Sequence, residues 1–524
     1  MAPRLLLLVI FTFVLSTSCA QSQVRKFPPS INHPGFNNFA PFISLDGTAL
    51  VYLSNVAEDD ALALLYTSKN GPDWRDPVQL PKSINHHLNF IRGFGLSAVG
   101  KSVYVSNPKA NGVGGYDLYV SRYNGTSWSE PENLTLPINT KGNEACPSFT
   151  TDGNTMYFMR CESMDTYKAA GCSLWMVSKK PNGQWGDPQA FPAFINTGNS
   201  QAPRILGDGE TLIFSSDKLS PNQGGMDLYM TKWSAGHWSS PLPLNFTNSP
   251  GDDQFASASA LGMYLLRDAK GTRNQELIEM LFPTELKPKA VMKIEGTVSI
   301  EGGTAPFVTV FNLKDQTKAA FAQPGKDGKF FLYVPEGNRY ELSIEPDRDN
   351  YTYYSKVYDL TGERIPQVER VNTALRPLSA GDEIALEDIR FRKSSAELDP
   401  EATQEMRRLT RMLKGNPSRY FAFEVLLKGH VIDSVRSDAD LTEVTTDTLK
   451  IPVTFRIDSV TTGTRDSIVL RTRYHNDRTL KQAQTIAQYL IQEGIPSARI
   501  AVSGKAEGEA IIENRKTLVK LIVH

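Results

Sequence analysis

The sequence predicts a multidomain chain in which an all-β propeller is followed by a small β-sandwich and an α/β domain. One observation behind this prediction is the phrase W-x-x-P-x-x-[LF], which begins at Trp74, Trp128, Trp185 and Trp238. These tryptophans are 54, 57 and 53 residues apart, a period typical of propeller or solenoid arrays. Another is that the repeats consist of short alternating runs, whereas a helical period begins only after about residue 382.

Other residues recur with the same period. Turn glycines occur at Gly47, Gly100, Gly153 and Gly209, and Ile-Asn pairs end at Asn32, Asn85, Asn139 and Asn196. Within one repeat, residues 199–244 contain about four short strands bounded by Gly, Asp and Pro turns. Four strands per unit indicate a propeller blade, and because each blade is covered only by its neighbours, we expect a closed ring.

The segments "SFTTDGNTMYF" and "ILGDGETLIFSS" resemble the TolB-type, WD-like propeller repeats of bacteria, and the resemblance covers residues 24–285. Blades are expected to open near residues 38, 90, 146, 201 and 254. The last lacks its own Trp-Pro strand, and the N-terminal "VRKFPPSIN" resembles the missing piece. We therefore favour five blades, with six as the alternative.

The N-terminus predicts export. Arg4 precedes an apolar run that ends in "LSTSC", and residues 1–18 resemble a lipoprotein signal peptide with Cys19 as the lipid attachment site. The alternative is a plain secretory peptide cut near "SCA". Because no acidic cluster follows Cys19, the resemblance implies the periplasmic face of the outer membrane. A formal net charge of −1 gives no indication of a nucleic-acid partner.

Three further cysteines follow. Cys161 and Cys172 flank a loop of the third repeat, and an oxidising compartment would permit a disulfide between them. The alternative is that both, like Cys146, are buried thiols. No His or Cys spacing indicates a metal site.

After a linker at residues 282–291, residues 292–360 alternate as strands with Gly turns. The pattern I-x-G-x-V, which starts at Ile294, resembles the carboxypeptidase-regulatory-like β-sandwich. The chain has no HExxH pair, so this resemblance implies no peptidase.

Residues 382–524 contain a strand "IALEDIRF", a helix that begins at Asp399-Pro400, and a second helix before the last strands. The pair Gly429-His430 and the pattern A-x-x-I-x-x-YL from Ala483 resemble the OmpA-like C-terminal domain. An insertion at residues 434–472 alternates like a β-hairpin, with its turn in "TTGTRD".

Domains of that family bind the diaminopimelate of peptidoglycan through an Asp two residues after the His of the Gly-His pair and an Arg on the next helix. A carboxylate and a guanidinium suit a ligand with ammonium and carboxylate groups. Here Ile432 and Gln482 hold those two positions, while Asp433 and Arg478 lie close by. Either Asp433 and Arg478 replace the missing pair in binding peptidoglycan, or the site no longer binds it. The candidate residues are Gly429, His430, Asp433, Arg478 and Gln482.

No nucleophile elbow, phosphate loop or metal spacing indicates an enzyme, and we expect no catalytic residues and no cofactor. The domain order resembles PorE-type lipoproteins associated with type IX secretion. It implies a tether between an outer-membrane partner, such as a PorP/SprF-like barrel, and the cell wall. The alternatives are a carbohydrate- or peptide-binding propeller with a ligand in its central channel, and a lyase or hydrolase.

Overall fold

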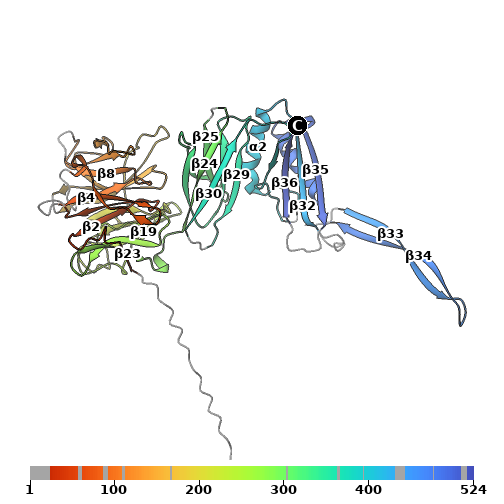
Figure 1. Cartoon of the computed structure of the whole chain (residues 1–524), viewed down its shortest axis with the longest axis horizontal. Helices are drawn as coiled ribbons and strands as arrows, with labels where there is room; N and C mark the ends of the chain where they lie inside the picture. The colour runs from red at the N-terminus through yellow and green to blue at the C-terminus, as the bar shows by residue number, and fades with distance from the viewer. Residues whose placement is uncertain are drawn as a thin grey trace, which may run out of the picture. The chain divides into compact units, whose positions relative to one another are not determined.

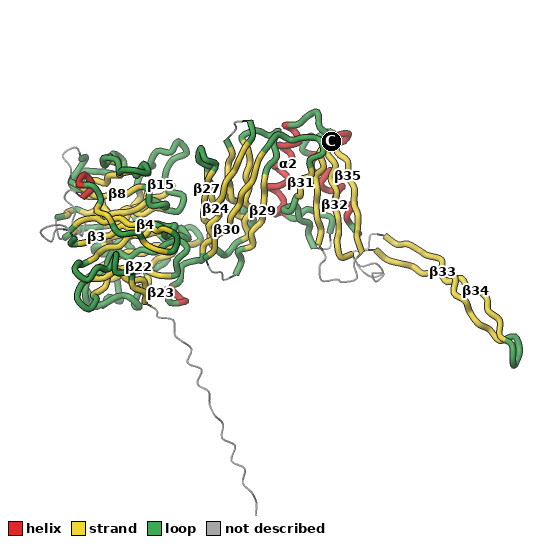
Figure 2. Tube along the Cα trace, in the orientation of Figure 1, coloured by secondary structure: helices red, strands yellow, loops and turns green. Residues whose placement is uncertain are grey.

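The computed structural model describes residues 24–56, 62–85, 93–108, 112–165, 168–302, 305–362, 366–393, 395–430, 443–475, 477–508 and 516–524. The predicted signal peptide and Cys19 lie outside these ranges. The chain divides into two compact units, Met1–Pro288 and Lys289–His524. Strands predominate in both units, and helices are few (Figure 2).

The described residues of the first unit form successive antiparallel sheets, some of whose strands are labelled in Figure 1. Their strands are β2 (Asn38–Ile43), β3 (Ala49–Ser54), β4 (Ala63–Asn70), β5 (Asp73–Trp74) and β6 (Val78–Gln79); β7 (Phe94–Leu96), β8 (Ser102–Asn107), β9 (Asp117–Arg122) and β10 (Glu132–Asn133); β11 (Asn143–Phe149), β12 (Thr155–Cys161), β15 (Ser173–Ser178) and β16 (Gln189–Ala190); β17 (Ser200–Ile205), β18 (Thr211–Ser216), β19 (Asp227–Ser234), β20 (His237–Trp238) and β21 (Leu242–Pro243); and β22 (Tyr264–Lys270), β23 (Gln275–Leu281) and β1 (Val24–Lys26). Three short elements are α1 (Lys82–Asn85), the hairpin of β13 (Ser163–Met164) and β14 (Ala169–Ala170), and η2 (Thr284–Leu286).

These sheets follow one another around a closed ring. The first strands of neighbouring sheets touch: β2 contacts β7, β7 contacts β11, β11 contacts β17, and β22 contacts β2. A buried apolar cluster that includes Ile213 and Ala258 joins the β17 sheet to the segment before β22. The N-terminal strand β1 completes the last sheet by pairing with β23, from Val24↔Met280 to Lys26↔Ile278. That is the position that the sequence predicts for the N-terminal segment.

The recurring asparagines tie the ring together. Asn139 is buried; its Oδ1 accepts from Leu118 N at 2.9 Å and its Nδ2 donates to Leu118 O at 3.0 Å. The same two-way bond links Asn248 to Leu228. Asn32, Asn85 and Asn196 make it to Leu277, Leu64 and Leu174. Each asparagine thus fixes a third strand, and Asn32 does so across the closure of the ring.

Local conformation also repeats. The turn glycines Gly47, Gly100, Gly153 and Gly209 all have φ between 67° and 70°, where a side chain would be strained. The first strand of the β11 sheet bulges at Cys146, which has φ 55°, and the β2 and β17 sheets bulge at Ala40 and Ala202. A bulge bends its strand and changes the direction of the next side chain. The residues after these bulges therefore meet at the ring centre.

The third sheet contains a disulfide. The structure joins Cys161, at the end of β12, to Cys172, before β15. Cys146 is fully buried, and burial raises the pKa of its thiol to about 11.

The second unit begins with two facing sheets, ordered β27-β24-β30 and β26-β25-β28-β29. Their strands are β24 (Val291–Ile300), β25 (Pro306–Asn312), β26 (Thr317–Ala322), β27 (Lys329–Pro335), β28 (Arg339–Pro346), β29 (Tyr354–Asp359) and β30 (Gln367–Leu375). The predicted end at residue 360 was too early. β30 pairs in parallel with β24 from Gln367 to Leu375, and its alternate residues Val371 and Leu375 are buried in the sandwich core.

The rest of the unit is a mixed sheet, ordered β31-β36-β32-β35, with two helices. Its elements are β31 (Glu383–Ala385), η3 (Pro400–Ala402), α2 (Thr403–Gly415), β32 (Phe421–His430), α3 (Thr479–Gln492), η4 (Ser497–Arg499), β35 (Ile500–Gly508) and β36 (Lys516–Val523). The predicted strand "IALEDIRF" is shorter than expected, because a turn in which Ile389 N donates to Leu386 O ends it. The Asp399 side chain caps the helical segment, as its sequence position predicts.

The insertion contains a long hairpin of β33 (Glu443–Arg456) and β34 (Thr462–His475). Its turn lies at residues 457–461, earlier than the predicted "TTGTRD". The reason is local: the Asp458 side chain accepts from Val460 N at 2.8 Å and Thr461 N at 2.6 Å, which forms the turn there. Among the described residues, these two strands pair only with each other.

Candidate functional site

The predicted wall-binding residues are only partly described. Gly429 and His430 end β32, and Asp433 lies outside the described residues. Arg478 immediately precedes α3, and its carbonyl accepts from Gln482 N at 2.8 Å. The Gln482 side chain is 8% exposed and its Nε2 donates to Ser395 O at 3.2 Å. Gln482 therefore points into the fold and ties it to a loop, while Arg478 is half-buried.

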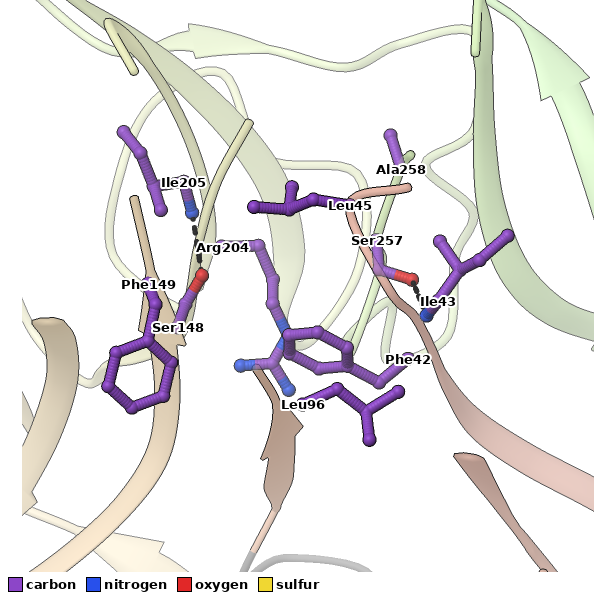
Figure 3. Close-up of a pocket in the computed structure, with 10 residues that line it drawn as sticks. All are labelled: Phe42, Ile43, Leu45, Leu96, Ser148, Phe149, Arg204, Ile205, Ser257 and Ala258. Carbon is purple, nitrogen blue, oxygen red and sulfur yellow. Dashed lines mark hydrogen bonds between the residues drawn. The ribbon is translucent and has the colours of Figure 1, made fainter. Parts of the chain in front are cut away.

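A second site lies at the ring centre, where residues from successive sheets line a pocket (Figure 3). Phe42 comes from β2, Leu96 from β7, Ser148 from β11 and Arg204 from β17, and Ser257 precedes β22. All the lining residues are buried. The two serines fasten neighbouring sheets, because Ser148 Oγ accepts from Ile205 N at 3.0 Å and Ser257 Oγ accepts from Ile43 N at 3.3 Å.

Arg204 fills much of this centre. Its side chain is 3% exposed, and the guanidinium lies 4.6 Å from the centroid of the Phe42 ring. Its Nη1 donates to Cys146 O at 3.3 Å and its Nη2 to Phe94 O at 3.1 Å. Burial lowers the pKa of Arg204 to about 10. The ring centre of the described structure is therefore packed with side chains.

A third site is a buried group of carboxylates in the second unit. Glu341 lies on β28, Asp388 on the segment after β31, and Glu405 on α2. They are 0%, 3% and 0% exposed, and one carboxylate oxygen from each lies within 4.8 Å of the others. The group thus lies where the sandwich packs against α2.

Arg408 stands beside this group. Its Nη2 donates to Glu341 Oε1 at 2.5 Å, its Nη1 to Glu405 Oε2, and its Nε lies 3.1 Å from Glu345 Oε1. Tyr353 donates from its hydroxyl to Glu405 Oε1. Burial alone would lower the pKa of Arg408, but Glu405 and Glu341 hold that pKa well above its usual range.

The carboxyl groups respond to the same burial. Desolvation raises the pKa of Glu341 to about 7, although Arg408 opposes the shift. Desolvation and Glu405 raise the pKa of Asp388 to about 6. Ser355 is near enough to lower the pKa of Asp388, yet neither oxygen of Asp388 has a partner in hydrogen-bonding geometry within the described part of the chain. The negative charge of these carboxylates, when ionised, therefore exceeds the positive charge of Arg408.

Sequence patterns did not indicate the second and third sites. Arg204 has no counterpart of its own type in the other repeats, where Phe42, Ser148 and Ser257 occupy the ring centre. The three carboxylates come from three separate elements, so no motif joins them. The bulge that precedes Arg204, at Ala202-Pro203, repeats at Ala40-Pro41 and Cys146-Pro147 and was a signal that could have located the ring centre.

Comparison with known proteins gives no family. No family model matches the chain, and no curated protein matches it. Solved structures that resemble part of it include a TolB protein of Agrobacterium tumefaciens, at 16% identity over 45% of this chain and 70% of that one, with a TM-score of 0.28. An α-L-arabinofuranosidase of Lactobacillus brevis matches at 12% identity over 50% of this chain and 95% of that one, with a TM-score of 0.32.

An oligogalacturonate lyase of Vibrio parahaemolyticus matches at 10% identity over 50% of this chain and 94% of that one, with a TM-score of 0.28. These likenesses are too weak to indicate an activity. Within the described ranges, no helix has the length and apolar character needed to cross a bilayer.

Proposed function

We propose that the chain is a non-enzymatic lipoprotein of the outer membrane, facing the periplasm, that works as a scaffold or tether. In this proposal the lipid on Cys19 holds the chain to the membrane. The first unit binds an outer-membrane partner, such as a PorP/SprF-like barrel of the type IX secretion system, and the OmpA-like part reaches the cell wall. The signal-peptide pattern and the order of the domains support this proposal.

The observation that carries the non-enzymatic part of the proposal is the packed ring centre. Arg204 and Phe42 occupy the space in which a propeller enzyme or a ligand-binding propeller would hold its small molecule. A ring with a filled centre still offers a broad outer surface of loops and sheet edges. Such a surface suits a protein partner better than a small substrate.

We also propose that the ring is a five-bladed propeller. Five asparagines each fix a third strand to its neighbour: Asn32, Asn85, Asn139, Asn196 and Asn248. Five residues with positive φ occur at matching positions near the centre: Ala40, Gly93, Cys146, Ala202 and Phe255. Both repeats occur once per sheet, which supports five blades over six.

Affinity purification of the full chain from native membranes, compared with Cys19→Ala, tests the tether. We expect a membrane barrel to co-purify with the natural chain, and we expect Cys19→Ala to appear in the soluble periplasmic fraction. Recovery of a small carbohydrate or peptide instead would favour the ligand-binding alternative. Turnover of a substrate by the purified chain would refute the proposal.

Sedimentation with purified sacculi tests the wall contact. We expect the full chain to pellet with the sacculi and Arg478→Gln to pellet less, because Arg478 lies one helical turn before Gln482, on roughly the same face of the helix. Lys481→Gln is the matched control, since Lys481 is an exposed cation on the same helix. If the natural chain stays in the supernatant, it makes no contact with the cell wall and the site does not bind peptidoglycan.

A further inference from the structure

The buried acids of the second unit exceed the cations that face them. The buried Glu341, Asp388 and Glu405 bring three negative charges against the one positive charge of the buried Arg408, and the half-buried Glu345 pairs with the exposed Arg411, which leaves two negative charges. Two exposed neighbours on the Asp388 segment, Glu387 and Arg390, carry opposite charges, and Arg390 lowers the pKa of Asp388. Burying carboxylates without compensating charge costs several kcal/mol per ion. That cost is avoided either by protonation, toward which the raised pKa values of Glu341 and Asp388 point, or by binding a further cation.

Specific atoms are left without partners. Both carboxylate oxygens of Asp388 and Oε2 of Glu341 are buried, and among the described residues none meets hydrogen-bonding geometry with them, although the Ser355 side chain is near enough to lower the pKa of Asp388. Arg408 occupies the other oxygen of Glu341, and Tyr353 and Arg408 occupy the two oxygens of Glu405. The unpartnered oxygens belong to the same group whose ligand atoms lie within 4.8 Å of one another. Such a spacing lets three oxygens touch one ion at 2.3–2.6 Å.

We propose that Glu341, Asp388 and Glu405 bind one divalent cation, and that Ca²⁺ is the ion that fits. All the donors are carboxylate oxygens, which suit hard cations rather than zinc or copper. Mg²⁺ demands near-ideal octahedral geometry and usually keeps several waters, whereas Ca²⁺ accepts mono- or bidentate carboxylates in flexible geometry, and these side chains are at most 3% exposed. A charge of +2 would also balance the two uncompensated negative charges.

The site would have a structural consequence. Glu341 belongs to the sandwich, and Asp388 and Glu405 belong to the part that contains the mixed sheet. A bound ion would therefore join these two parts of the second unit more firmly. This inference is independent of the proposed tether function, because it depends only on contacts within the second unit.

Calorimetric titration of Ca²⁺ into the full chain, after removal of metals with EDTA, tests the proposal. Tb³⁺ is a second probe, because its luminescence is sensitised by nearby aromatic rings and Tyr353 contacts Glu405. All six tryptophans lie in the first unit, so sensitisation through tryptophan would indicate a site there. Tyrosines occur in both units, so the loss of luminescence in a variant of the site is what assigns the signal. We expect one saturable site, and a rise in the melting temperature of about 5 °C or more at saturating Ca²⁺.

Asp388→Asn is the diagnostic variant, because it keeps the shape of the side chain and removes the charge. We expect it to stay folded in EDTA, since it relieves repulsion, and to lose the Ca²⁺-dependent shift and the tyrosine-sensitised luminescence. Glu387→Gln is the matched control, an exposed acid one residue away, and should bind as the natural chain does.

Three results would overturn the proposal. One is the absence of saturable Ca²⁺ binding by the natural chain. Another is equal Ca²⁺ binding by Asp388→Asn. The third is a thermal shift with Mg²⁺ as large as the shift with Ca²⁺, which would refute the choice of ion.

Discussion

Two buried arginines show how differently the two units accommodate a charge. Arg204, in the ring, is 3% exposed and donates to the carbonyls of Cys146 and Phe94. Among the described residues no carboxylate contacts it. Arg408, in the second unit, is 4% exposed and is surrounded by Glu341, Glu345 and Glu405. The ring thus uses neutral acceptors, whereas the second unit uses ion pairs.

The pKa values of the two guanidiniums move in opposite directions for this reason. Burial lowers the pKa of Arg204 to about 10, whereas Glu405 and Glu341 hold the pKa of Arg408 well above its usual range. Removing Arg408 would leave buried carboxylates uncompensated. Removing Arg204 would leave only neutral carbonyls. The comparison therefore predicts a large loss of stability in one case and a small loss in the other.

The largest effect is expected for Arg408→Met, measured by urea unfolding in EDTA followed both by tyrosine emission, which comes from both units, and by tryptophan emission, which comes from the first unit alone. Breaking a buried ion pair by removing one partner costs about 3–5 kcal/mol, because a buried charge stays behind. The second unit should lose stability by that amount, while tryptophan fluorescence of the first unit should be unaffected.

Arg407→Met is the control, because Arg407 is the exposed neighbour on the same helix. It should change the free energy of unfolding by only about 0.5 kcal/mol. Equal effects of the two substitutions would show that the ion pairs of Arg408 do not hold the second unit together.

The next effect tests the neutral bonds of the ring. Asn248→Ala removes the side chain that bonds both Leu228 N and Leu228 O, and Leu228 is buried. Leaving buried backbone groups unsatisfied costs about 1–3 kcal/mol, so we expect a loss of about 2 kcal/mol in unfolding followed by tryptophan fluorescence. Asn245→Ala is the control, because Asn245 is exposed and bonds only Gln223 among the described residues.

Much of the ring could be predicted from the sequence because its turns and its asparagine hydrogen bonds depend on short motifs that recur in each repeat. The four turn glycines have positive φ, and the four Ile-Asn pairs supply four of the five asparagine ties. Asn248 was missed because Thr247 precedes it where the others have Ile. Its repeat thus differs from the Ile-Asn pattern at one residue, whereas Asn248 makes the same pair of backbone hydrogen bonds as the other four asparagines.

The candidate sites were harder to predict because they depend on packing. Glu341, Asp388 and Glu405 are separated by 47 and 17 residues and meet only when the sandwich packs against α2. Metal sites are recognised in a sequence by the spacing of His and Cys residues, and a set of distant carboxylates has no such spacing. Gln482 was located by resemblance, but only the structure shows that its amide points inward to Ser395.

The smallest effect is expected for Arg204→Met, and it tests the comparison most directly. Met retains much of the apolar stem volume, so the loss comes from hydrogen bonds to carbonyls and from the contact with Phe42. Relief from burying a charge offsets part of this loss, and we expect about 1 kcal/mol by urea unfolding with tryptophan fluorescence.

Arg204→Lys sharpens the test, because an ammonium keeps the charge but is hydrated more strongly and cannot reach two carbonyls with a planar fork. We expect Arg204→Lys to destabilise the ring more than Arg204→Met does, although Lys is the closer chemical match. The reverse order would mean that the charge at the ring centre is itself favourable. A carboxylate or a bound anion would then have to face Arg204, and the contrast with Arg408 would no longer hold.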